Sequence, residues 1–115
     1  MADLVPPGAS MAEVLRNTEG LIGVPIRISR RDLQGPSAVV ARGDVAVMVI
    51  DSSVEADRLS HIIGHELGHL ALGHDGGERR HYDTSSERDA ELFGTLTARR
   101  MRMPRLSVRS RTFRW

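Results

Sequence analysis

Two histidines one helical turn apart, with a glutamate beside the first, are the residues of this chain best suited to chemistry. They form the motif His-Glu-Leu-Gly-His at residues 65–69. Positions four apart lie on one face of a helix, so the imidazoles of His65 and His69 can reach one metal ion. A catalytic zinc usually has three protein ligands and one water, and Glu66 is placed to take a proton from that water. The spacing therefore predicts a zinc-dependent peptidase with Glu66 as its catalytic base.

The same five residues could also lie in a metal-free amphipathic helix, or in a metal site without catalysis. The context favours the catalytic interpretation, because the surrounding segment has the apolar periodicity of a helix and recognisable ends. Ser52 followed by Glu55 matches a capping box, and Gly73 matches a helix stop. We therefore expect the motif to lie on a helix over about residues 53–73.

The third ligand must be a histidine or a carboxylate, because the chain contains no cysteine. Glu87 and Glu91 are four residues apart in a second predicted helix, over about residues 85–102, and so share one face. One of them can bind zinc directly, while the other holds a ligand imidazole by its second N–H. The alternative is an ordinary acidic first turn, favoured by the helix dipole.

Three further histidines and a tyrosine lie near the motif. His61 continues the stripe of the two motif histidines and could be a ligand, a cleft residue or a polar residue at the helix edge. His74 suggests the metzincin pattern, but the required glycine and histidine each fall one residue away from their positions. His81 and Tyr82 lie in a polar loop between the two helices. Either could stabilise the oxyanion of the transition state, or simply be solvated.

The remaining elements must position these side chains. After an unstructured lead over residues 1–8, Ser10 with Glu13 predicts a capping box at the start of a first helix, which glycines end by Gly23. β-Branched runs predict a strand and then a hairpin, at residues 24–29, 38–41 and 45–50.

This order of elements predicts an α+β fold. A small antiparallel three-stranded sheet would pack on the metal helix, and the second helix would supply the third ligand. The strand at residues 45–50 directly precedes the metal helix, so it is our candidate for a sheet edge that binds substrate as an added strand.

The 115 residues fit one domain, expected over residues 1–104, with an Arg-rich tail at residues 105–115. No apolar run approaches the roughly 20 residues that span a bilayer. The N-terminus also lacks the features of a secretory signal. We therefore expect a cytoplasmic protein that does not associate with membranes.

Charge is distributed unevenly along the chain. Residues 1–98 carry nine arginines against 15 acidic residues, whereas residues 99–115 carry seven arginines and no acid. Residues 99–115 could recruit a partner, or dock in part on the acidic remainder of the chain at low salt. Phe113 and Trp115 could stack on bases, but the acidic body makes direct nucleic-acid binding the less favoured interpretation.

Three segments together resemble the ImmA/IrrE metallopeptidase family, a compact relative of the thermolysin-like gluzincins. They are the motif at residues 65–69, the pattern E-x-x-A-E-x-F at residues 87–93 and Met103-Pro104. The resemblance covers about residues 37–104, which is most of the expected folded domain. It departs from the family at Glu91, where Asn or Asp is usual, and at Gly94, where Ala is usual.

The resemblance implies that His65, His69 and Glu87 bind Zn²⁺, that Glu66 is the catalytic base and that Glu91 supports a ligand from behind. It also implies an intracellular endopeptidase that cleaves a DNA-binding repressor of the helix-turn-helix type. The alternative is a regulatory protein with a structural or sensory zinc, which sequesters a transcription factor without cleaving it. Retention of Glu66 favours catalysis, because a structural site needs no base.

Overall fold

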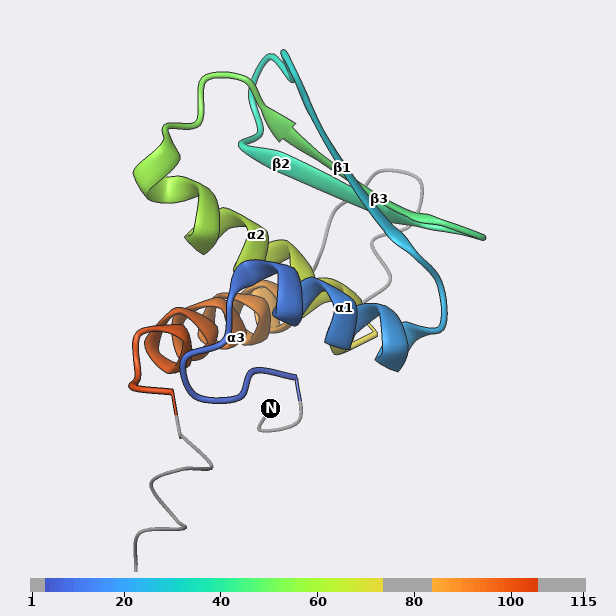
Figure 1. Ribbon diagram of the computed structural model, residues 1–115. Helices are drawn as coiled ribbons and strands as arrows, with labels where there is room; N and C mark the ends of the chain where they lie inside the picture. Colours follow the sequence, from blue (N-terminus) through green and yellow to red (C-terminus); the bar gives the residue numbers. More distant parts are fainter. Residues whose placement is uncertain (1–3, 74–83, 106–115) are drawn as a thin grey trace, which may run out of the picture.

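The computed structural model describes residues 4–73 and 84–105. The described part has an α+β fold of three helices and a three-stranded sheet (Figure 1). The elements in chain order are α1 (Met11–Ile22), β1 (Ile26–Arg31), β2 (Ala38–Arg42), β3 (Ala46–Asp51), α2 (Ala56–Ala71) and α3 (Thr84–Met101). The expectations for His74, His81, Tyr82 and the tail from residue 106 onwards lie outside the described residues.

The sheet is mixed, with β3 in the centre and β1 and β2 at its edges. β2 and β3 form the predicted antiparallel hairpin, in which Val40 lies opposite Met48. β1 instead runs parallel to β3, with Ile28 opposite Met48, so the prediction of a wholly antiparallel sheet is wrong. The chain crosses from one edge of the sheet to the other between β1 and β2, and a pairing of this kind leaves no local turn signal in the sequence.

The central position of β3 also corrects the candidate substrate strand at residues 45–50. Both sides of β3 are paired, so this strand has no free edge to offer. Within residues 4–73 and 84–105, β1 and β2 each keep a free edge, and of the two it is β2 that packs substantially against α2.

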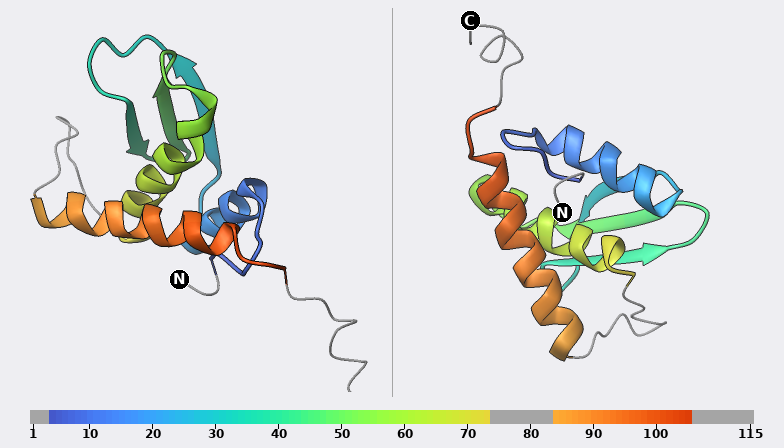
Figure 2. Two further views of the ribbon diagram at one scale, coloured as in Figure 1. Left: turned by 90° about the vertical axis from the view of Figure 1, so that its left-hand side faces the viewer. Right: turned by 90° about the horizontal axis from the view of Figure 1, so that it is seen from below.

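All three helices lie on one side of the sheet, and α3 is the farthest from it (Figure 2). Alternate residues of β3, which are Ala46, Met48 and Ile50, are fully buried, as expected for a strand with one face on the core. Leu67 of α2 and Phe93 of α3 belong to the same apolar cluster. α2 therefore lies between the sheet and α3 and contacts both.

The helix ends agree only partly with their sequence signals. The capping box of α1 is confirmed, because Ser10 Oγ accepts from Glu13 N at 3.2 Å and Glu13 Oε1 accepts from Ser10 N at 3.1 Å. The capping box expected for α2 at Ser52 is wrong, since that helix begins at Ala56 after Glu55, which makes no side-chain cap. The serines before it belong instead to the turn after β3, where Ser53 N donates to Asp51 Oδ2 at 3.0 Å.

Residues 4–9, which precede α1, are part of the folded body, and this corrects the expectation of an unstructured lead for the described part of residues 1–8. Val5 is fully buried and belongs to the core cluster. Gly8 N donates to Arg100 O at 2.8 Å, and Asn17 Nδ2 donates to Leu4 O at 3.0 Å. The segment therefore fastens the start of α1 to the end of α3. No helix in the described ranges combines the length and apolar content that crossing a bilayer requires.

Candidate metal centre

Small residues allow α2 and α3 to cross with their backbones in contact. A Cβ added at Gly68 would meet Ala90 Cα at 3.0 Å, and one added at Gly64 would meet Gly94 Cα at 3.3 Å. Even alanine at position 94 would meet the backbone nitrogen of His65 at 3.0 Å. Glycine at position 94 therefore fits the close crossing of the two helices.

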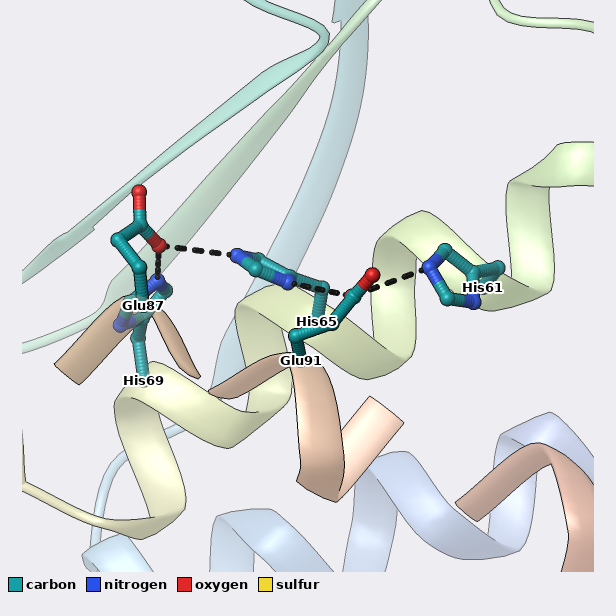
Figure 3. A network of polar contacts seen from close by, with 5 residues as sticks. All are labelled: His61, His65, His69, Glu87 and Glu91. Atoms are coloured by element: carbon teal, nitrogen blue, oxygen red, sulfur yellow. Dashed lines mark hydrogen bonds and ion pairs between the residues drawn. The ribbon is translucent and has the colours of Figure 1, made fainter. Parts of the chain in front are cut away.

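The crossing brings the histidine stripe of α2 against the two glutamates of α3 (Figure 3). Glu87 Oε1 lies 2.7 Å from His69 Nε2 and 3.1 Å from His65 Nε2. Glu91 Oε1 lies 3.0 Å from His65 Nδ1 and 3.1 Å from His61 Nε2. The two helices run in opposite directions at this contact, so the spacing of four residues on each helix matches that on the other.

His65, His69 and Glu87 form a group that could hold a metal ion. One donor atom from each lies within 4.8 Å of the others. Two imidazole nitrogens and one carboxylate oxygen are a donor set that Zn²⁺ uses in catalytic sites, where the fourth position is left for water. The residues present therefore fit the metal that the motif predicted.

The group is closed on one side and open on the other. The side chain of His69 is only 2% exposed, whereas that of Glu87 is 51% exposed. The rings of His65 and His69 meet edge to face, with their centroids 5.0 Å apart. The group is therefore accessible to solvent from the side of Glu87, while packing fixes the orientation of His69.

Glu66, beside the first histidine, is buried, with 8% of its surface exposed. Burial raises the pKa of its carboxyl group to about 7, and Glu87 adds to this rise, although His65 opposes it. A carboxyl group that titrates near neutral pH is well suited to accept and return a proton.

Glu91 lies where a residue that supports a ligand should lie. It contacts the Nδ1 atom of His65, and therefore leaves the Nε2 atom directed towards His69 and Glu87. The hydrogen bond to His65 is the main cause that lowers the pKa of Glu91. Burial alone would lower the pKa of His65, but the hydrogen bonds to Glu91 and Glu87 outweigh it and raise that pKa.

His61 is not a member of the donor group. Its Nε2 atom contacts Glu91 Oε1, the same oxygen that His65 Nδ1 contacts. It can therefore support that carboxylate, but it does not approach Glu87 (Figure 3). This contact was not predicted. The matched spacing of residues 61, 65 and 69 with residues 87 and 91 is a signal that allows it, although the spacing does not fix the relative direction of the two helices. The repeated small residues at 64 and 68, and at 90 and 94, were a second signal that was missed.

Comparison of the chain with protein-family models, with curated proteins and with solved structures found no match. The functional conclusion therefore depends on the residues and geometry of this chain.

Proposed function

We propose that this chain is a zinc-dependent endopeptidase. The observation that carries the proposal is the convergence of His65, His69 and Glu87 on one point, with Glu66 buried beside the first of them. His65 and His69 hold the metal from α2 and Glu87 holds it from α3. Zn²⁺ bound there would polarise the scissile carbonyl and lower the pKa of its water towards about 7.

Glu66 acts on the attacking water as a general base and then returns the proton to the leaving amine. Burial of Glu66 limits its contact with solvent. Zn²⁺ bound nearby would favour the ionised form of the Glu66 carboxyl group and so oppose the effect of burial on its pKa. Glu91 holds His65 through Nδ1 and so fixes which nitrogen the ring presents to the metal.

The substrate binds in this proposal as a strand along the outer edge of β2, because β2 packs against α2 and no other described strand pairs with that edge. The resemblance to the ImmA/IrrE family suggests the substrate class, a DNA-binding repressor of the helix-turn-helix type. It also suggests a cytoplasmic site of action.

A zinc-containing protein that sequesters a transcription factor is the second candidate, because the same three donors could serve a structural site. The burial of Glu66 argues for catalysis instead. Burying a carboxyl group costs stability, and a structural metal site gains nothing from that cost.

Zinc-loaded protein should be incubated with a labelled unfolded protein and, if a neighbouring gene encodes a helix-turn-helix repressor, with that repressor. We expect cleavage by the wild type, and a loss of about 10²-fold or more in Glu66→Gln with zinc retained. Glu55→Gln is the matched control, since Glu55 is exposed and makes no side-chain cap. Cleavage by Glu66→Gln at the wild-type rate would refute the catalytic role. Tight binding of the repressor without cleavage would support the sequestering protein.

A further inference from the structure

An apolar groove lies on the side of α3 away from the metal group. Its volume is about 500 Å³, and it is lined by side chains from the N-terminal segment and all three helices, chiefly Leu4, Leu21, Leu72, Leu92, Phe93 and Leu96. Three of these leucines are unusually exposed for their size, at 57% for Leu21, 48% for Leu72 and 57% for Leu92. Ligand sites are usually concave, with volumes of about 300–1,000 Å³ and mostly apolar linings, so the groove is a candidate binding site.

The position of the groove on α3 separates it from the metal group. Residues 92 and 96 follow each other along one face of the helix, whereas Glu87 and Glu91 lie on a different face. An occupant of the groove would therefore leave the metal donors accessible.

We propose that the groove is the docking site of the chain's own C-terminal residues 106–115, held there by their apolar and aromatic side chains. This segment contains Leu106, Val108, Phe113 and Trp115. An aromatic side chain buries about 150–250 Å² when it is enclosed, and exposed leucines offer it suitable contacts. The proposal concerns a surface distinct from the metal group and does not depend on the proposed peptidase activity.

The place where the segment begins supports this occupant. Arg105 is paired with Glu13 and donates to Gly8 O at 3.2 Å, so the last described residue is fastened to the body. Arg100 donates to the carbonyl of Val5, whose neighbour Leu4 lines the groove. The segment therefore starts close to one end of the groove.

The length and charge of residues 106–115 also suit docking in the groove. Ten residues extend to about 33–36 Å, whereas the 18 residues of α3 span about 27 Å. The segment can therefore reach any part of the groove. The one charged residue of the lining, Asp89, is acidic, and the segment carries three arginines and no acid.

The apolar lining of the groove changes the salt dependence of docking that the charges of the sequence had predicted. An exposed pair between Asp89 and an arginine contributes little and is screened by salt, whereas apolar contacts are not. We therefore expect docking to persist in 1 M NaCl, where the Debye length is about 3 Å.

Trp115 is the only tryptophan, so its fluorescence in the full-length protein reports directly on this segment. Acrylamide quenching of the protein is compared with quenching of a free peptide of residues 106–115. A groove that is occupied most of the time should reduce the quenching constant to less than half that of the peptide. Leu21→Gln and Leu92→Gln each remove an apolar contact, and each should weaken docking about tenfold or more. Val47→Gln, at an exposed position on β3, is the control and should leave quenching unchanged.

The helical circular dichroism signal shows whether each variant is folded. Two groove variants are used so that one remains if the other does not fold. Protection of Trp115 that both groove variants abolish, at 0.1 M and at 1 M NaCl, supports the proposal. Quenching of the wild type equal to that of the free peptide overturns it. So does protection that neither groove variant reduces, or that 1 M salt abolishes. Protection that appears only as protein concentration rises also overturns it, because the occupant would then be the segment of a second copy.

Discussion

Gly68 of α2 lies directly against the backbone of Ala90 in α3. A Cβ at position 68 would meet the Cα of Ala90 at 3.0 Å and its carbonyl oxygen at 3.1 Å. Main-chain atoms cannot move aside as the end of a flexible side chain can. The separation between the histidines of α2 and the glutamates of α3 is therefore set by the contact of two backbones.

Replacing this glycine should disturb both stability and metal binding. We expect Gly68→Ala to lower the free energy of unfolding by about 1–3 kcal/mol, since the added methyl group must push α3 away. It should also weaken zinc binding, because Glu87 moves with α3. Urea unfolding with chelator present and a competitive zinc titration measure the two effects.

Gly20→Ala is the matched control for that substitution. Gly20 also lies in a helix, but a Cβ there meets nothing within 4 Å, so alanine should stabilise the protein by about 0.5–1 kcal/mol. Equal free energies of unfolding for Gly68→Ala and Gly20→Ala would show that the contact between α2 and α3 tolerates a methyl group at position 68.

The proposed ligand set predicts about one zinc per chain. Glu87→Ala should lose most of this zinc after dialysis, because two histidines alone do not complete a site. Asp89→Ala, two residues along the same helix and outside the donor group, should retain it. Elemental analysis of both dialysed proteins measures the zinc content per chain. Full zinc occupancy in Glu87→Ala would remove Glu87 from the ligand set.

The contact between Glu91 and His65 predicts a graded loss of metal affinity. We expect Glu91→Gln to weaken zinc binding by about 10–100-fold, as is typical when a residue that supports a metal ligand is changed. His61→Ala should have a smaller effect, because His61 contacts Glu91 Oε1 but no residue of the donor group. Competitive titration with a zinc-sensitive dye ranks the three proteins. A larger effect of His61→Ala than of Glu91→Gln would contradict the geometry.

Glu66 predicts a pH dependence of stability in the zinc-free protein. Its pKa is about 7 in the fold against an ordinary value of 4.5. Between these values the folded state binds more protons than the unfolded state, so stability falls as pH rises. The loss approaches an upper limit on the order of 3 kcal/mol, since each pKa unit is worth about 1.4 kcal/mol.

Glu66→Gln removes this titration and keeps the shape of the side chain. Its unfolding free energy relative to the wild type, measured in urea with chelator present, should therefore rise from pH 5 to pH 8. A difference that stays constant over this range would show that Glu66 titrates normally in the folded protein.

The hairpin and the three helices could be predicted from the sequence because their signals are local. Ser10 and Glu13 meet within one helical turn, and the strands joined through Gly43 are neighbours in the chain. The pairing of β1 with β3 could not be predicted, since it depends on a connection that crosses the sheet. The start of α2 was missed because Asp51 engages Ser53, a competition that the capping pattern does not reveal.

The candidate site was predictable to the extent that it depends on helical spacing. The motif placed His65 and His69 on one face, and the structure brings Glu87 to both. The burial of Glu66 could not be predicted from the motif, because it depends on how the helices and the sheet pack. The contact between His61 and Glu91 required the relative direction of α2 and α3, which sequence spacing alone does not fix.

The division of the donor atoms between α2 and α3 has a consequence for the energetics of local opening. A metal held by two donors from α2 and one from α3 is a cross-link between the helices, and it must be released before they can separate. By thermodynamic linkage, free metal at about 1,000 times its dissociation constant raises the free energy of such opening by about 4 kcal/mol. Amide hydrogens of α3 near Glu87 should then exchange more slowly as metal is added. The coupling is reciprocal, so a protein that draws α3 away from α2 would also lower the affinity of the chain for its metal.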